Sequence, residues 1–366
     1  MQTMDRIKAR EILEARISKG RASAVSLFER IENDVPTDAL VKGTALRFSA
    51  EGSLTISLGD NDPLSVHRHA FHQLAQRASI PGLYLSDLAT STEGWERELA
   101  SEILTRHYQH GHAATRFLVR EVQGQIRGFL SDRYRRLDSR PLLEAFAIEC
   151  QKAGAVPIDG IVTDTRVALK AIVPQVYEPI PGELMAFGIE WSNSDFGAGV
   201  HALRAYMLRV ACLNGATLEN SLAQVHLGRQ LSEDGFQLSE RTYQLDTRTS
   251  ISALRDVVGG VLSEGKIDAL CQAVRQADER EVEWRNVHTA LGRRLIKSEL
   301  EAVRHAFESQ DVVNLPPRRS MWRASNALSW IAGNLENADR KLELERLAGQ
   351  MATGKRDELP QMDGEQ

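Results

Sequence analysis

The stretch from residue 116 to residue 131, RFLVREVQGQIRGFLS, constrains the fold of this chain most strongly. Two apolar runs flank Gln123 and Gly124, and such a pair of residues between two β-forming runs is typical of a tight hairpin turn. We therefore predict an antiparallel strand pair whose register places Arg120 opposite Arg127. Like charges that face each other destabilise a strand pair, so this register requires full solvation or an anion between the two guanidinium groups.

Arginine is concentrated around this hairpin, although the whole chain has a formal net charge of −5. Residues 111 to 140 contain seven arginines against three acidic residues, which gives this segment a net charge of +4. Guanidinium groups bind phosphate in a bidentate manner, and an aromatic ring beside them offers a stacking surface for a base. The segment therefore predicts a local binding surface for a polyanion.

The predicted nucleic-acid-binding residues are these basic side chains, two aromatic residues between them, and two arginines from a later strand in support. The set is Arg120, Arg127, Phe129, Arg133, Tyr134, Arg135, Arg136, Arg204 and Arg209. Arg204 and Arg209 are five positions apart, so on a regular strand they point to opposite faces and only one can join the same surface. The alternative is that the arginines pair with acidic residues of the C-terminal helices and form an ordinary solvated face.

The composition is that of a folded protein, because 42% of the 366 residues are hydrophobic and 26% are charged. The order strand–strand–helix–strand–strand–strand predicts an α+β fold with a central, mostly antiparallel sheet, flanking helices and a C-terminal helical layer. We predict a helical segment at 1–43, an α+β core domain at 44–248, a C-terminal helical region at 249–352 and a disordered tail at 353–366.

Several features bear on the compartment. The chain has no run of about 18 apolar residues, so no membrane helix is expected. Its first twenty residues are charged and lack the apolar stretch of a signal peptide. The three cysteines lie far apart, which argues against a disulfide scaffold and against a structural zinc site. We therefore expect a cytoplasmic protein.

Motifs for catalysis are weak. Four acidic residues near the basic region are candidates for two-metal chemistry: Asp132, Asp138, Glu190 and Asp195. They match no nuclease signature, and the chain has no GxxxxGK[ST] loop that would bind a nucleoside triphosphate. His67, His69 and His72 have a spacing that a helix could bring to one metal, but no acid or cysteine follows at a suitable distance. We expect no catalytic residue, no cofactor and no metal.

Several segments stand in the order in which they occur in a known family. They are FHQLAQRASIPGLYLSDL, FLSDRYRRLDS, SNSDFGAG, LRAYMLRVACLNG, VHLGR and WRASNALSWIAGNLENADRKLELERLAG. Over about residues 44 to 349 the chain thereby resembles the phage/plasmid-like domain of unknown function 932 family. The resemblance implies an origin in phages, plasmids or integrating elements. The strand order and the arginine-rich hairpin are more distantly similar to ring-forming single-strand annealing recombinases.

Together these observations predict a protein of phage or plasmid origin that binds single-stranded DNA, or RNA, without ATP and promotes strand annealing in recombination or replication. We expect it to be a homo-oligomer. A second hypothesis is a protein–protein interaction component of a mobile element with no nucleic-acid activity, which intramolecular pairing of the arginines favours. A third is a metal-dependent nuclease, which requires carboxylates that converge in one cleft.

Overall fold

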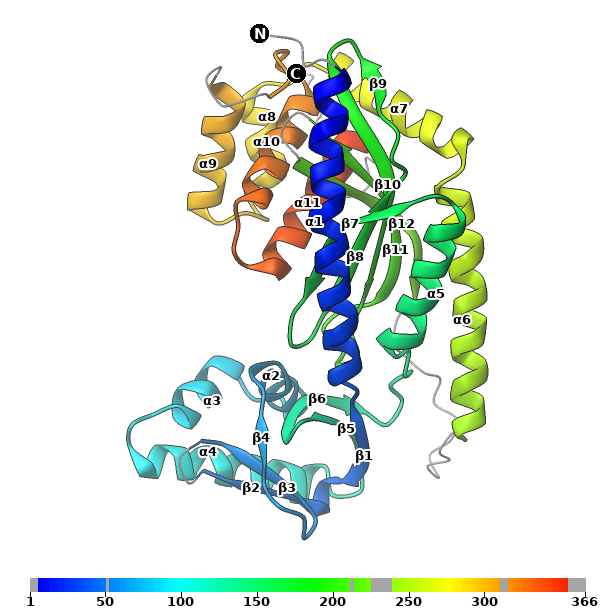
Figure 1. Ribbon diagram of the computed structural model, residues 1–366. Helices are drawn as coiled ribbons and strands as arrows, with labels where there is room; N and C mark the ends of the chain where they lie inside the picture. Colours follow the sequence, from blue (N-terminus) through cyan, green and yellow to red (C-terminus); the bar gives the residue numbers. More distant parts are fainter. Residues whose placement is uncertain (1–5, 51–52, 211–213, 225–238, 310–314, 355–366) are drawn as a thin grey trace.

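The computed structural model describes residues 6–50, 53–210, 214–224, 239–309 and 315–354 of the chain. Its helices and strands form two lobes, each built around its own sheet (Figure 1). The predicted α+β class, with mainly antiparallel pairing and helices at the C-terminal end, is confirmed. The prediction of one central sheet is wrong, because the strands before and after residue 139 belong to separate sheets.

The small lobe contains six strands and three α-helices. They are β1 (Thr37–Lys42), β2 (Leu46–Ser49), β3 (Thr55–Leu58), β4 (Leu64–Val66), β5 (Arg116–Val122), β6 (Gln125–Ser131), α2 (Arg68–Arg77), α3 (Gly82–Ala89) and α4 (Gly94–Arg106). The strand order is β1-β5-β6-β4-β3-β2, and every pair is antiparallel except β4 with β6. Tyr108 lies at the centre of the core, where its ring contacts Phe117 and Phe129.

The predicted arginine-rich hairpin is strands β5 and β6. Gln123 and Gly124 both have positive φ angles, 51° and 79°, as expected at the two central positions of a type I′ turn. The predicted register holds next to the turn, but a β-bulge then places Arg120 opposite Gly128 instead of Arg127. The bulge leaves Arg127 without a cross-strand partner, and it thereby removes the like-charge pair that a regular register would create.

The large lobe contains the remaining elements. They are α1 (Arg6–Asn33), α5 (Ser139–Lys152), β7 (Val156–Val162), β8 (Val167–Ile172), β9 (Tyr177–Ile180), β10 (Glu183–Asn193), β11 (His201–Arg209), β12 (Asn214–Gln224), α6 (Glu240–Val261), α7 (Glu264–Glu279), α8 (Trp284–Leu291), α9 (Lys297–Glu308), α10 (Met321–Gly333) and α11 (Ala338–Thr353). The antiparallel strand order is β12-β11-β10-β8-β7, and β9 pairs with β10.

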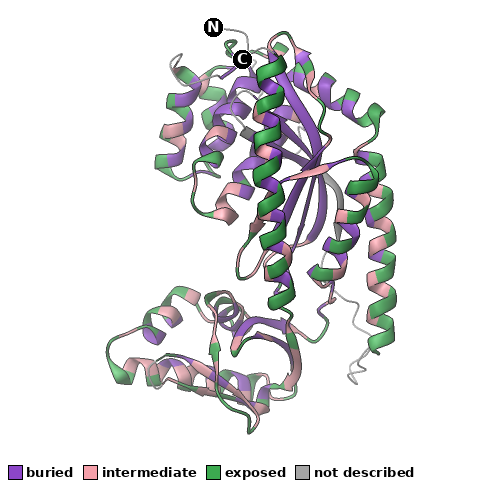
Figure 2. Cartoon of the chain, viewed as in Figure 1, coloured by how far each residue is buried: buried purple, intermediate pink, exposed green. Residues whose placement is uncertain are grey.

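Helices cover both faces of the large-lobe sheet. Every residue of β8, β10 and β11 is buried, which Figure 2 shows as a continuous inner layer (purple) beneath helices with exposed outer faces (green). On one face Trp191 stacks with Phe146 of α5. On the other face Leu13 of α1 belongs to one apolar cluster with Ile158 of β7 and Tyr206 of β11. Burial on both faces explains why these strands have near-continuous apolar runs instead of strict alternation.

Helix α1 is part of the large lobe and not a separate N-terminal segment. It crosses β7 so closely that a Cβ atom on Gly20 would lie 2.2 Å from the Cα of Ile158. The hydroxyl oxygen of Ser23 accepts a hydrogen bond from the amide of Gly160 at 3.0 Å. The predicted boundary at residue 43 is therefore wrong, since β1 of the small lobe already begins at Thr37.

The other predicted boundaries also shift. Helix α6 begins at Glu240, ahead of the predicted start of the helical region at 249. Helix α11 extends to Thr353, and Gly354 ends it with a φ of 66°. The rest of the predicted tail lies outside the described residues. Among the helices that the structure describes, none is long and apolar enough to cross a membrane.

Candidate functional site

The arginine-rich hairpin meets the loop between β10 and β11 at the junction of the two lobes. Arg120, only 2% exposed, lies at its centre. Its Nε donates to Asp38 and its Nη2 to Asp138, both at 2.7 Å, and its Nη1 donates to the backbone oxygen of Asp195 at 2.8 Å. Burial opposes the charge of Arg120, but the carboxylates of Asp138, Asp38 and Asp195 outweigh it and raise its pKa. Arg120 is therefore a permanent structural cation.

Arg127 fastens the small lobe to the end of α1. Its Nη1 donates to Oδ2 of Asp34 at 2.6 Å, and its side chain is 8% exposed. Oδ2 of Asp34 also accepts from Nε of Arg30 at 2.5 Å. Burial would raise the pKa of Asp34, but the hydrogen bonds from Arg30 and Arg127 lower it below its ordinary value. Arg127 is thus engaged by an acidic residue far away in the sequence.

Arg135 and Arg136 connect the segment after β6 to helix α6. The guanidinium of Arg135 donates two hydrogen bonds to Asp246, each of 2.5 Å. Arg136 donates to Asp38 at 2.9 Å, and its guanidinium carbon lies 3.8 Å from the centroid of the Tyr243 ring. Both arginines are partly buried. Their charges are balanced within the fold, as the second hypothesis requires.

Arg204 and Arg209 of β11 lie inside the large lobe. Arg204 forms an ion pair of 3.3 Å with Glu190, and Arg209 forms hydrogen bonds of 2.5 and 2.7 Å with Glu183. Burial, together with the nearby charge of Arg346, lowers the pKa of Arg204 to about 10. Both side chains are buried, so neither can support an external binding surface.

The two predicted base-stacking residues are also buried. Phe129 is fully buried in the small-lobe core, where its ring stacks on Phe117 with centroids 4.9 Å apart. Tyr134 donates its hydroxyl proton to the backbone oxygen of Ser194 at 3.0 Å, and burial raises its pKa. Neither ring is available to a base.

The prediction of one exposed cationic surface is therefore wrong. Arg133 alone of the nine predicted residues is exposed, and it forms no ion pair with any residue that the structure describes. The neutralising acids include Asp34, Asp38 and Asp246, which lie far from the hairpin in sequence. A charge count over residues 111 to 140 could not include them. Arg120 and Arg127 serve instead to join the lobes.

The loop after β10 completes the junction. Phe196 is buried, and its backbone oxygen accepts from Nε2 of Gln73 at 2.9 Å and lies 3.0 Å from Nε2 of His69. His67 accepts a hydrogen bond from the amide of His69 at the start of α2. Burial lowers the pKa of His69, which favours its neutral form. Two of the histidines considered for metal binding thus have structural roles, and the described residues contain no group of three or more potential metal ligands.

We predict that Asp195 makes the stability of the junction dependent on pH. Its carboxylate accepts from the amide and hydroxyl of Ser139, at 2.8 and 2.7 Å. Burial, and then the charge of Asp138, raise the pKa of Asp195 from 3.8 to about 6. An acid with a raised pKa binds its proton more tightly in the folded state, so it contributes stability that is lost as the pH rises from about 4 to about 6.

The Asp195→Asn variant keeps an oxygen acceptor for Ser139 but cannot titrate. Its free energy of unfolding should vary less between pH 4 and pH 6 than that of the wild type, and at pH 7 it should be at least as stable. The Asp195→Ala control loses the acceptor and should be less stable at every pH. Urea denaturation across a pH series measures these differences. Parallel wild-type and Asp195→Asn curves would contradict the prediction.

A second polar cluster lies between the large-lobe sheet and α11. Glu190 is fully buried and accepts from the hydroxyl of Thr217 at 2.9 Å. Its Oε1 also lies 3.4 Å from Arg346 of α11, and the neighbouring Lys170 donates to Glu345 of the same helix. The four predicted nuclease acids therefore do not all converge: Asp138 and Asp195 meet at Arg120 in the lobe junction, whereas Glu190 lies beneath α11. The third hypothesis has no geometric support.

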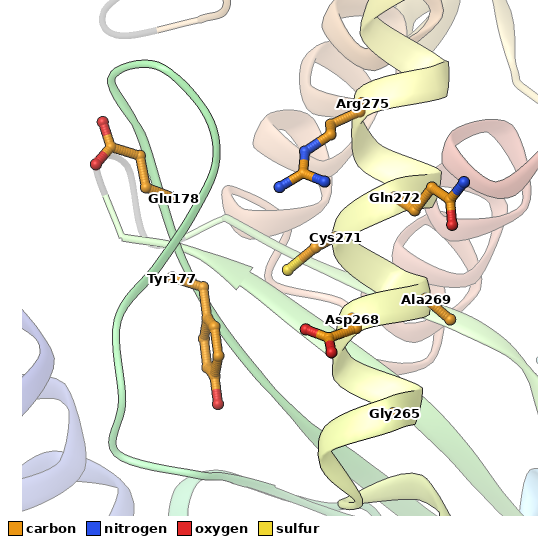
Figure 3. A pocket seen from close by; sticks show the side chains of 8 residues that line it. All are labelled: Tyr177, Glu178, Gly265, Asp268, Ala269, Cys271, Gln272 and Arg275. Carbon is orange, nitrogen blue, oxygen red and sulfur yellow. The ribbon is translucent and has the colours of Figure 1, made fainter.

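An open groove of about 580 Å³ lies between β9 and α7 (Figure 3). Tyr177 and Glu178 project from β9, while Asp268, Cys271 and Arg275 come from α7. Two of these groups are already engaged: Glu178 accepts from Arg6, and Nε of Arg275 donates to the backbone oxygen of Pro179 at 2.7 Å. Burial raises the pKa of Cys271, which keeps its thiol protonated. The lining therefore contains no activated nucleophile.

An exposed apolar feature that the sequence patterns did not indicate lies on the small lobe. We call residues 82–106, which form α3 and α4, the acidic hairpin. Leu83, Tyr84 and Trp95 are 78%, 52% and 62% exposed there. The segment contains five acidic residues and two arginines, a net charge of −3. The signal that could have found this feature is a tryptophan among charged residues, in EGWERE.

Comparison of the chain with protein-family models, with curated proteins and with solved structures finds no match.

Proposed function

We propose that this chain is a protein–protein interaction component of a phage or plasmid, and that the acidic hairpin is its docking surface. The observation that supports the proposal is the exposure of Trp95, at 62%, on α4, together with that of Leu83 and Tyr84 on α3, the helix that contacts it. Single exposed apolar residues are ordinary, but three large ones on one helical hairpin favour an interaction site. The mobile-element setting rests on the family resemblance alone.

The chemistry of the hairpin selects the kind of partner. Tryptophan and tyrosine are enriched among residues that dominate binding energy, and each buries about 150–250 Å² when it is covered. The net charge of −3 on the same segment favours a basic partner surface and disfavours a nucleic acid. A partner with apolar pockets and Lys or Arg side chains around them fits both properties.

The ion pairs of the arginines remove the physical basis of the nucleic-acid hypothesis. Binding to a polyanion gains affinity from cations that release counterions, and an arginine that is already paired with a carboxylate contributes little of this effect. Arg120, Arg127, Arg135 and Arg136 are all paired within the fold. Strand annealing stays a prediction. An electrophoretic shift with labelled single-stranded DNA and RNA, across a salt series, tests it directly.

We predict that a photo-crosslinking amino acid at position 84 captures the partner in cells that carry the element. The same amino acid at Val25 is the matched control, because Val25 is 58% exposed on α1 of the other lobe. With the captured partner purified, Trp95→Ala should weaken its binding by roughly tenfold or more, since the loss of a central aromatic anchor typically has this effect.

Two outcomes would overturn this function. One is equal crosslinking from positions 84 and 25, which would indicate collisions without a defined surface. The other is an unchanged dissociation constant for Trp95→Ala, measured by calorimetry. Tight, salt-sensitive binding of the wild type to the oligonucleotide would return the nucleic-acid hypothesis to first place.

A further inference from the structure

A second exposed surface of the protein has a net charge opposite in sign to that of the acidic hairpin. We call residues 292–297, between α8 and α9, the basic turn. It contains Arg293, Arg294 and Lys297 and no acidic residue, a net charge of +3. Ile296 within it is 64% exposed, so the turn also presents a large apolar side chain. It therefore offers both the cations and the exposed apolar side chain that would complement the acidic hairpin.

We propose that a second copy of this chain occupies the acidic hairpin, and that the copies assemble head to tail through the acidic hairpin of one and the basic turn of the next. A second copy of the chain is then the partner that docks on the acidic hairpin, so this inference rests on the proposed function. Opposite net charges, −3 and +3, and exposed apolar residues on both surfaces make the two complementary.

The positions of the two surfaces exclude a contact inside one copy. The acidic hairpin belongs to the small lobe, at the lower left of Figure 1, whereas α8 and α9 lie on the large lobe at the upper left. Arg293 forms no ion pair with any residue that the structure describes, and Lys297, which is 91% exposed, lies 4.0 Å from Glu301. Arg294 donates a hydrogen bond to Gln350 at 3.2 Å. Arg293 and Lys297 are thus the cations of the turn that can meet a neighbouring molecule.

The start of α1 is the competing basic surface, and its charge is weaker. Ile7 is 67% exposed and lies among Arg6, Lys8 and Arg10. The nine residues 6–14 also contain two glutamates, so their net charge is +1, whereas the nine residues 292–300 have a net charge of +2. Arg6 is moreover paired with Glu178 at 2.8 Å. The basic turn is therefore the better match for a surface of charge −3.

A contact between two different surfaces is heterologous. Repeating it produces a ring when the rotation between copies closes, and an open filament when it does not. Because every open assembly then keeps one free surface of each kind at its ends, the size of the assembly should rise with protein concentration. The attraction is between exposed charges, so high salt should weaken it.

The test uses the purified full-length chain in sedimentation velocity over a concentration series at low and high salt. We expect oligomers for the wild type, and mainly monomers for Trp95→Ala and for the double variant Arg293→Glu/Lys297→Glu, with association weakened roughly tenfold or more. The changed side chains are exposed, and thermal unfolding checks that each variant is folded. The double variant Lys8→Glu/Arg10→Glu is the control, and it should assemble like the wild type.

Mixing the two monomeric variants is the decisive measurement. Trp95→Ala retains a working basic turn, and Arg293→Glu/Lys297→Glu retains a working hairpin. The mixture should therefore form one-to-one dimers and nothing larger. A mixture that stays monomeric, or a wild type that is monomeric at every concentration, would overturn the proposal. If a different protein is nevertheless captured at position 84, the interaction function stands and only self-assembly is lost.

Discussion

Replacing Arg120 with methionine should lower the free energy of unfolding by about 3 kcal/mol, because the change leaves several carboxylates at the lobe junction without their common cation. Asp38 and Asp138 each accept a hydrogen bond from this one guanidinium, at 2.7 Å. The loss should lie at the lower end of the range for buried ion pairs, since Asp138 is 47% exposed and water can screen it. Urea denaturation followed by tryptophan fluorescence measures the change.

Arg133→Met is the matched control for Arg120→Met. It removes the same kind of side chain from the same segment, but at an exposed position with no ion pair to the described residues. Its effect on stability should stay within about 0.5 kcal/mol. If the two variants were equally stable, the structural role assigned to the arginines would be wrong, and a role of Arg120 in ligand binding would again need consideration.

Replacing Lys170 with methionine should lower the free energy of unfolding by about 3 to 5 kcal/mol, the largest effect expected in the large lobe. Lys170 is 1% exposed, and it donates to Glu345, which is 3% exposed. Without its partner, the carboxylate would be buried and uncompensated beneath α11. Burial already raises the pKa of Glu345, so in the variant this residue should take up a proton.

Two measurements separate this explanation from a simple packing defect. The deficit of Lys170→Met should shrink as the pH falls toward the pKa of Glu345, because an acid whose folded pKa is raised stabilises the fold at low pH. The double variant Lys170→Met/Glu345→Leu should recover much of the loss at pH 7, since two apolar groups can replace a buried ion pair at little cost. A pH-independent deficit that the second substitution does not relieve would point to packing instead.

The polar contacts at the lobe junction also fix how the two lobes are oriented. The junction joins the lobes through directional polar contacts made by Arg120, Arg127 and Tyr134, and not through a shared apolar core. The hydrophobic cores of the two lobes are separate. Ion pairs and hydrogen bonds depend on geometry, so they hold the lobes in one orientation, which keeps the acidic hairpin at a defined position relative to the basic turn.

Local patterns predicted local structure well. The Gln123-Gly124 pair predicted the turn of the β5–β6 hairpin, where both residues adopt the positive φ angles that the turn requires. The register of the hairpin was not predicted, because Arg127, at the bulge, pairs with Asp34, which lies outside the hairpin.

The same distinction applies to function. By itself the sequence determined the α+β class, the turns, and the presence of a dense arginine segment, because these depend on residues within a few positions of one another. The tertiary structure decided whether those arginines were free, since Asp34, Asp38 and Asp246 neutralise them from distant parts of the chain. It also decided that Trp95 stays exposed, because the exposure of a side chain depends on what packs over it after folding.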